Sequence, residues 1–278
     1  MIIAFQGEHG AYSELAAFEH FGSEITTVPC ESFEDVFEAF SQGKCTHVLL
    51  PFENSLAGSI HRNYDLILRH EVHIVSEYNL KVSHCLMGLP GVTLEEIREA
   101  HSHPQALAQC EHSLTRLGIK KVAEKDTAGS ARLVKEWKNP HIAAIASSRA
   151  AQVYDLQVFV ENLEDNPDNY TRFLALTHQP LAVDDPENGD FKTSVVFSLK
   201  NQPGALFKAL SVFALRDIDL SKIESRPIPG RTFEYMFYVD FLGHQQALNC
   251  ARALDHLGEL ATYLRVLGSY PRHRMTQN

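Results

Sequence analysis

The chain lacks the sequence features of membrane and nucleic-acid-binding proteins. Its longest apolar runs, such as residues 142–146, are far too short to cross a bilayer. Residues 1–5 show no basic segment and no cleavage site, so we expect no secretory signal and a cytoplasmic protein. Asp and Glu (35) outnumber Lys and Arg (25), and the formal net charge of −10 argues against nucleic acid as a partner.

The sequence also shows no clear signature of a disulfide framework, a metal site or a dinucleotide-binding loop. The five cysteines are an odd set without a C-x-x-C pair, which is typical of reduced, buried thiols. His101 and His103 alternate at a strand end, but no cysteine or carboxylate stands in register with them, so we predict no metal site. Gly7 and Gly10 do not have the spacing of a dinucleotide-binding loop.

The order of strand and helix signals indicates more than one domain. At 278 residues the chain is too long for one ordinary core. Strand and helix signals alternate over residues 1–180, which predicts an α/β domain of two lobes with a ligand cleft, like that of periplasmic binding proteins. We place lobe one at about residues 1–78 plus 156–180, and lobe two at about 79–155.

The remainder of the chain has a different pattern. Residues 178–190 are polar and rich in turn formers, and we place a linker at 181–191. Residues 192–278 follow the order βαββαβ, which predicts a ferredoxin-like unit with two helices on one face of its sheet.

Polar turns at the starts of helices and strands carry the candidate chemistry. The turn at residues 7–13 opens a helix, and its backbone N–H groups favour an anion. The turns at 51–55, 102–105 and 126–129 add hydroxyl and amide groups that can bind a substrate. The candidates in these turns, with one helical residue nearby, are Gly10, Ala11, Tyr12, Ser13, Glu53, Asn54, Ser55, Ser102, Gln109 and Thr127.

The most informative segment is Asn169–Phe173, which leads into the apolar run at residues 173–176. In a strand, Thr171 and Phe173 share one face, and Arg172 takes the other. The turns are rich in hydrogen-bond donors, but they contain no nucleophile–base pair and no redox group. This combination favours an anionic substrate and an electrostatically assisted reaction.

The motifs occur in the order found in a known family. G-x-x-G-A-Y-S, P-F-E-N-S, S-H-P-Q, D-T-A and N-Y-T-R-F resemble those of short, amino-acid-regulated prephenate dehydratases over nearly the whole chain. The C-terminal unit resembles an ACT regulatory domain of the phenylalanine-binding type, with G-A-L-F at 204–207 and E-S-R-P at 224–227.

The resemblance implies a lyase reaction in L-phenylalanine biosynthesis. Prephenate would lose carbon dioxide and hydroxide to give phenylpyruvate, without a metal or cofactor. Thr171 would donate a hydrogen bond to the leaving hydroxyl, and Arg172 and the backbone of the Gly10–Ser13 turn would balance carboxylate charge. The other residues expected to bind or orient the substrate are Glu53, Asn54, Ser55, Ser102, Gln109, Thr127, Asn169 and Phe173.

The ACT resemblance implies feedback by L-phenylalanine at the interface of paired ACT units, and hence a homodimer or homotetramer. Asn201 and Gln202 precede a helix N-terminus, which suits an amino acid's carboxylate. Leu206 and Phe207 are expected on the buried side of this helix. The full predicted phenylalanine site comprises Asn201, Gln202, Gly204, Ala205, Leu206, Phe207, Glu224, Ser225, Arg226 and Pro227.

Three alternatives remain open. An arogenate dehydratase performs the same elimination on the aminated substrate, and activity on both substrates is part of this alternative. The small Ala175 after T-R-F-L resembles the prephenate-using pattern. A two-lobed solute-binding protein and an amino-acid sensor without activity are the other two alternatives, and turnover of prephenate would exclude both.

Overall fold

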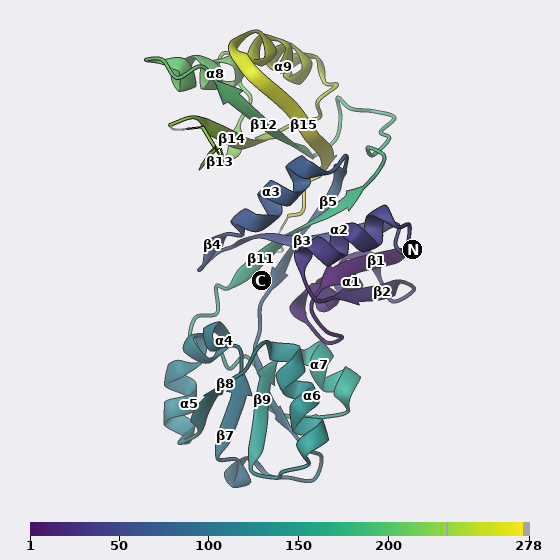
Figure 1. Cartoon of the computed structure of the whole chain (residues 1–278), viewed down its shortest axis with the longest axis vertical. Coiled ribbons are helices and arrows are strands. Elements are labelled where there is room, and N and C mark those ends of the chain that lie inside the picture. The colour runs from purple at the N-terminus through teal and green to yellow at the C-terminus, as the bar shows by residue number, and fades with distance from the viewer. Residues whose placement is uncertain (229, 232, 275–278) are drawn as a thin grey trace. The chain divides into compact units, whose positions relative to one another are not determined.

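The structure is a computed structural model, and it describes residues 1–228, 230–231 and 233–274 (Figure 1). It divides into two compact units. The first comprises Met1–His70 and Tyr78–Phe173, and the second comprises Glu71–Glu77 and the chain from Leu174 onward. Within the described residues, no helix is both long and apolar enough to span a membrane.

One sheet contains the N-terminal strands. Its strands are β1 (Ile2–Gln6), β2 (Thr26–Cys30), β3 (His47–Asn54), β4 (Gly58–Ser59), β5 (His73–Lys81) and β11 (Tyr170–Thr177). The strand order is β2-β1-β3-β11-β5, with β4 paired to β3. β1 pairs in parallel with both β2 and β3, so the carboxyl ends of these three strands share one edge. β5 and β11 each continue from one unit into the other.

Helices α1 (Tyr12–Phe21), α2 (Phe33–Ser41) and α3 (His61–Arg69) accompany this sheet. The start of α2 follows from its sequence: Ser32 accepts from the N–H of Asp35, and the Asp35 carboxylate accepts from the N–H of Ser32. Val36, Phe37 and Phe40 form its buried side, as the helical spacing predicts.

A second sheet belongs to the first unit. Its strands are β6 (Cys85–Gly88), β7 (Glu99–Ser102), β8 (Lys120–Ala123), β9 (Ile142–Ala146) and β10 (Gln157–Val160). The order is β10-β6-β9-β7-β8, parallel at β7–β8 and β7–β9 and antiparallel at β6–β9 and β10–β6. The accompanying helices are η1 (Leu94–Glu96), α4 (Pro104–Gln109), α5 (Glu111–Leu117), α6 (Thr127–Trp137) and α7 (Ser148–Tyr154).

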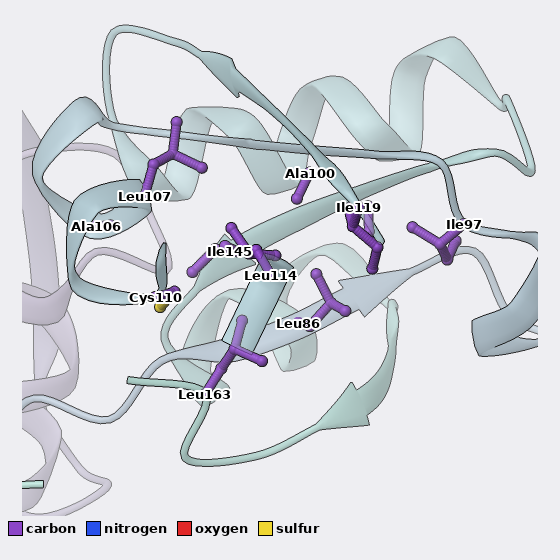
Figure 2. Close-up of a cluster of buried hydrophobic side chains, with 11 residues drawn as sticks. Leu86, Ile97, Ala100, Ala106, Leu107, Cys110, Leu114, Ile119, Ile145 and Leu163 are labelled. Atoms are coloured by element: carbon purple, nitrogen blue, oxygen red, sulfur yellow. The ribbon is translucent and has the colours of Figure 1, made fainter. Parts of the chain in front are cut away.

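Alternation along the central strands gives this sheet an apolar core on both faces. Leu86 and Ile145 point to one face and pack with residues of α4 and α5, such as Leu107 and Leu114 (Figure 2). The neighbouring strand residues, Met87 among them, point to the other face and pack with α6 and α7. The sheet is therefore covered by helices on both sides, as expected for an α/β fold.

The position of β10 corrects the predicted lobe boundary. The sequence pattern assigned residues 156–180 to lobe one, but β10 pairs with β6 in the second sheet. Lobe two therefore extends past residue 155. The reason is that lobe membership depends on strand pairing, which the local pattern of residues 156–160 does not encode.

The second unit contains the predicted βαββαβ fold. Its elements are β12 (Phe191–Leu199), α8 (Ala205–Ala214), β13 (Leu220–Pro227), β14 (Tyr235–Leu242), α9 (Leu248–Leu260) and β15 (Ala261–Pro271). The antiparallel sheet has the order β13-β14-β12-β15. Val195, Phe197 and Val239 pack against α8 and α9. The α/β fold followed by a ferredoxin-like unit is thus confirmed.

The same unit includes a buried ion pair. Lys192 Nζ on β12 lies 2.7 and 2.8 Å from the two carboxylate oxygens of Glu77 on β5. The side chain of Glu77 is fully buried, and the backbone N–H of His273 also donates to it. Residues 71–77 therefore group with the C-terminal fold, although the sequence pattern placed them in lobe one.

Candidate active site

A cavity of about 340 Å³ lies in the first unit, among strand ends and helix starts. Its lining combines amides, hydroxyls and apolar groups. The predicted residues in it are Tyr12, Ser13, Asn54, Gln109, Thr127, Asn169, Thr171 and Phe173. The sequence interpretation did not select the remaining lining residues, which are Gln6, Pro51, Ala57, Ile60, Val82, His84, His103, Gln105, Ala106 and Asp126.

Asn54 joins the end of β3 to the start of β11. Its Nδ2 donates to Asn169 Oδ1 at 2.8 Å and to Thr171 Oγ1 at 3.0 Å. Its Oδ1 accepts from the N–H groups of Leu56 and Ala57. These hydrogen bonds hold Thr171 and Asn169 in place at the cavity, which Asn54 also lines.

Thr171 and Asn169 present hydrogen-bond donors at the cavity. Because Thr171 Oγ1 accepts from Asn54, the threonine hydroxyl proton can be donated to another group. The Nδ2 group of Asn169 is buried and finds no hydrogen-bond partner among the described residues. An unpaired buried donor is costly, so this amide is suited to an oxygen of a bound ligand.

Three further side chains of the lining are joined to one another by hydrogen bonds. Tyr12 Oη lies 2.6 Å from His84 Nδ1, and His84 Nε2 lies 2.8 Å from Gln109 Oε1. Tyr12 Oη also lies 3.0 Å from the carbonyl oxygen of Ser83. Because an amide oxygen only accepts, we assign the imidazole proton to Nε2, and the one hydroxyl proton of Tyr12 is then shared between His84 Nδ1 and the Ser83 carbonyl. The Gln109 carbonyl faces His84, so its NH₂ group is directed elsewhere.

Burial determines the protonation of these side chains. It lowers the pKa of His84, against the opposing effects of the Gln109 hydrogen bond and the Glu164 carboxylate. Burial likewise raises the pKa of Tyr12 well above its ordinary value. Both side chains are therefore neutral near pH 7, which agrees with the assigned hydrogen-bond directions.

The charge of the lining is unusual for an anion site. Among the described residues that line the cavity, Asp126 is the one carboxylate, and no Lys or Arg is present. Asp126 caps α6, with its Oδ1 accepting from the N–H of Gly129 at 2.6 Å. The start of α6 also places Thr127 in the lining.

Ser102 does not reach the cavity. It is fully buried, and its hydroxyl donates to the carbonyl of Ile145 at 2.6 Å, which ties β7 to β9. The cap of α4 is His103 rather than Ser102. The predicted contact between Ser102 and a substrate carboxylate is therefore wrong for this structure, because the hydroxyl proton is already donated.

The backbone of Gly10 is also engaged. Its N–H donates to Glu14 Oε2 at 2.7 Å, so it does not provide the predicted anion contact. Its φ of 88° needs glycine, and an added Cβ would lie 2.8 Å from the Cα of Ala150 on α7. Gly10 thus allows the turn to pack closely against α7.

Several other predicted residues lie outside the lining. Ser55 donates to the carbonyl of Asp168 and accepts from the N–H of Tyr170, which fixes the start of β11. Arg172 follows Thr171 on β11 and therefore takes the opposite face. Ala11, Glu53 and the fully buried Ala175 do not line the cavity either.

Sequence reasoning missed His84 and Asp126 as parts of the site. His84 lies between β5 and β6, directly before the apolar residues of β6, and a polar ring beside this apolar run was an available signal. Asp126 was read as the start of a helix, because an aspartate at an N-cap has a sufficient local explanation.

The cysteines carry no sign of catalysis. Burial raises the pKa of Cys45 and Cys85 to about 11, so both are protonated thiols near pH 7. Among the described residues, no group of three or more His, Cys, Asp or Glu side chains could hold a metal ion.

The second unit has a smaller cavity of about 130 Å³ beside the start of α8. Of the predicted phenylalanine-site residues, Asn201, Gln202, Ala205 and Leu206 line it, together with Phe233. The predicted residues that do not line it are Gly204, Phe207, Glu224, Ser225, Arg226 and Pro227.

Phe207 corrects one expectation about this helix. Its exposed fraction is 77%, so the side chain is not buried within one chain, and the expected burial of Leu206, which is 36% exposed, is wrong as well. The interior side of α8 is instead formed by Ala209, Val212 and Phe213.

Fold and cavity together define a two-lobed α/β protein with a candidate ligand site whose lining combines apolar groups with largely uncharged polar ones. The sequence pattern of the prephenate dehydratase family matches residues 3–181, and that of the ACT domain matches residues 193–255. The chain therefore belongs to the prephenate dehydratase family, whose members are lyases that act by dehydration and decarboxylation. This confirms the resemblance seen in the motifs.

Curated relatives carry two substrate names. The chain is 50% identical over 278 residues to arogenate dehydratase/prephenate dehydratase 2, chloroplastic, of Arabidopsis thaliana, a match covering 97% of this chain and 72% of the relative. It is 48% identical over 285 residues to arogenate dehydratase 2 of Petunia hybrida, covering 97% and 71%.

Two solved structures are similar over nearly the whole chain. One is described as GqqA, a novel type of quorum-quenching acylase, with a TM-score of 0.92, 38% identity and 98% of each chain covered. The other is a prephenate dehydratase from Arthrobacter aurescens in complex with L-Phe, with a TM-score of 0.87 and 32% identity. That match covers 98% of this chain and 90% of the other.

Proposed function

We propose that the chain catalyses the decarboxylating dehydration of a prephenate-type ring, converting prephenate to phenylpyruvate or arogenate to phenylalanine. The observation that carries the proposal is the Thr171 hydroxyl, held by Asn54 at a cavity that Phe173 also lines. In a chain of this family, the arrangement gives a hydrogen-bond donor beside an apolar ring wall.

The reaction requires two bonds to break and no redox change. The electron pair of the bond between C1 and its carboxylate enters the ring, and carbon dioxide leaves. The C4–oxygen bond breaks, and hydroxide takes up one proton to leave as water. Aromatisation supplies the driving force, so the protein must orient the ring and stabilise the departing oxygen.

Thr171 is suited to the departing oxygen, and neutral surroundings suit the lost carboxylate. Thr171 can donate its proton because Asn54 already supplies its oxygen with a hydrogen bond. No Lys or Arg lines the cavity within the described part of the chain, so the ring carboxylate has no counter-ion there to lose as it becomes carbon dioxide. The site therefore does not stabilise the ring carboxylate of the bound substrate more than it stabilises the transition state, in which that charge is being lost.

Turnover of the two substrates tests the proposal directly. Purified protein is mixed with prephenate, and phenylpyruvate is followed by absorbance; it is then mixed with arogenate, and phenylalanine is measured by chromatography. Turnover of either substrate that is lost in Thr171→Ala supports the proposal. No turnover of either substrate by the unaltered chain contradicts it.

Amide cleavage, suggested by the description of GqqA, is the weaker candidate for this chain. An acylase needs a base to activate a nucleophile or water. Both ring nitrogens of His84 are engaged, one by Tyr12 and the other by Gln109. Nδ1 of His103 accepts from the N–H of Gln105. Release of free amine from an N-acyl amide in the same assay would revive this activity.

We also propose that L-phenylalanine binds the second unit and inhibits the reaction. Support comes from the L-Phe complex of the Arthrobacter relative and from the cavity at Asn201 and Gln202, beside the start of α8. The exposed Phe207 and the half-exposed Ile223 suit a second copy of the chain, so we propose a homodimer or homotetramer.

Kinetics and light scattering together test this regulation. Inhibition requires that L-phenylalanine bind the inactive state more tightly than the active one. We expect added L-phenylalanine to shift the substrate saturation curve and the chain to elute as a dimer or larger. A monomer whose saturation curve is unmoved by L-phenylalanine contradicts both parts. The cytoplasmic location stays a prediction.

A further inference from the structure

Prephenate and arogenate differ at one group on the side chain. Prephenate has a keto group there and arogenate an ammonium, and both have the same ring, hydroxyl and two carboxylates. The net charge is therefore −2 for prephenate and −1 for arogenate at neutral pH. Any preference between them must come from protein groups that favour or disfavour a positive charge at this position.

The lining of the 340 Å³ cavity has a charge that bears on this choice. Asp126 is its one carboxylate among the described residues, and no described Lys or Arg lines it. Asp126 also lines a second cavity, of about 460 Å³, together with Lys125 and Arg132. The Arg132 guanidinium is paired with Glu8 and Glu136. Burial lowers the pKa of His84, so that imidazole supplies no compensating charge near pH 7. A fixed negative charge in such a lining attracts an ammonium and repels a dianion.

The carboxylate of Asp126 is held in place at the cavity. Oδ1 accepts from the N–H of Gly129 at 2.6 Å, and this is the one hydrogen bond to the carboxylate from the described part of the chain. This carboxylate belongs to the N-cap residue of α6. The remaining lone pairs can therefore accept from a ligand's ammonium without breaking the cap.

We propose that Asp126 is the specificity-determining residue of this site and selects the substrate that carries an ammonium, arogenate, over its keto analogue. This inference rests on the proposed dehydratase activity and names the substrate that the activity prefers. The capping role of Asp126 does not by itself require a charge, because Asn and Ser cap helices as well as Asp does. Helix capping therefore does not account for the negative charge of this residue, and we assign that charge to substrate selection.

The test compares kcat/KM for arogenate and prephenate in the unaltered chain and in Asp126→Asn, which keeps the cap and removes the charge. We expect the unaltered chain to prefer arogenate. In Asp126→Asn we expect the ratio of the two constants to fall about tenfold or more, as is typical for a charge pair in a binding site. Most of the change should come from a loss with arogenate.

Glu124→Gln is the matched control. It removes one carboxylate two residues away that contacts His101 and does not line the cavity. We expect this variant to leave the ratio unchanged. Asp126→Ser, another good cap, should reproduce the result of Asp126→Asn and exclude an effect peculiar to the asparagine amide.

The outcomes separate the two proposals. If the unaltered chain turns over neither substrate, the dehydratase activity is wrong. If it turns over both and either prefers prephenate or keeps its ratio in both Asp126 variants, the activity stands and the role of Asp126 is overturned. Thermal melts of all variants identify any loss that comes from unfolding instead.

Discussion

His84 Nε2 lies 2.8 Å from Gln109 Oε1, and this contact determines which end of the Gln109 amide faces the cavity. The amide oxygen is held by the imidazole, so the NH₂ group is left to meet a substrate oxygen. Tyr12 fixes the imidazole in turn through Nδ1. His84, which also lines the cavity, thus sets the orientation of the Gln109 amide, and we treat it as a positioning residue.

Removing the imidazole should therefore reduce turnover through Gln109. We expect His84→Ala to lower kcat by about 10- to 100-fold, the cost of a misoriented contact in an active site. His84→Gln can still contact Tyr12 and Gln109 and should restore part of the rate. Steady-state kinetics on both variants checks this.

A double-mutant cycle with Gln109→Ala isolates the contact. If His84 acts through Gln109, the loss in the double variant is much smaller than the product of the two single losses. Independent, multiplying losses would show that His84 contributes in another way.

Stability should fall on the acid side because His84 is buried and neutral. The folded-state pKa is lowered below the ordinary value of about 6.5, so below that pH the unfolded chain binds a proton that the folded chain does not. The stability present above this value is thus lost as the pH falls through the folded-state pKa. Burial acts in the same direction on His47, His70, His73, His244 and His273.

Urea denaturation between pH 7.5 and pH 5 measures this loss. Replacing His84 by Gln removes one titrating group, so we expect a shallower fall of unfolding free energy with pH in that variant. A curve with the same slope as the unaltered chain would mean that His84 takes up its proton equally well in the folded state.

Local sequence signals explain much of the fold. The Ser32–Asp35 capping box and the apolar spacing behind it fix the start and the buried side of α2. The membership of β10 in the second sheet could not be predicted, because it depends on pairing with β6, far away in the chain. Residues 71–77 are a similar case, since the burial of Glu77 depends on Lys192, over a hundred positions later.

Site residues could be predicted where the alternation of side chains along a strand indicated which face each residue takes. The period of two placed Thr171 and Phe173 on one face of a strand, and both line the cavity. Ser102 was misassigned because a serine before a helix has the same local sequence whether its hydroxyl meets a ligand or a neighbouring strand. His84 was missed because its role arises from contacts with two separate segments.

Thr171 provides the most direct test of the chemistry. Thr171→Ala removes the donor to the departing hydroxyl and should raise the barrier by about 2–4 kcal/mol, the scale of one lost donor in an oxyanion site. Thr171→Ser keeps the hydroxyl and the hydrogen bond from Asn54 and should retain most of the activity. Full turnover by Thr171→Ala with both substrates would assign the donor role to another group.

Gly10 gives a prediction about packing in the first unit. Gly10→Ala places a Cβ 2.8 Å from the Cα of Ala150 and adds a side chain at a φ of 88°, so we expect a loss of about 1–3 kcal/mol of stability. Gly22→Ala has a similar φ of 84° with open space around the Cβ, so it isolates the backbone strain. Urea denaturation measures the loss of unfolding free energy in both variants. Equal losses would show that the new methyl group at residue 10 fits against α7 without any further loss of stability.

The Lys192–Glu77 ion pair gives a final prediction, about the second unit. Lys192→Met should cost about 3–5 kcal/mol, because it removes the ammonium that pairs with the fully buried Glu77 carboxylate. Adding Glu77→Leu removes the buried charge, so the double variant should recover most of the lost stability, with the N–H of His273 losing its acceptor. Urea denaturation of the single and double variants gives the coupling free energy. Recovery would show that the stability lost in Lys192→Met comes mainly from burying the Glu77 charge. If the double variant is no more stable than Lys192→Met, the loss comes mainly from the missing packing of the lysine side chain.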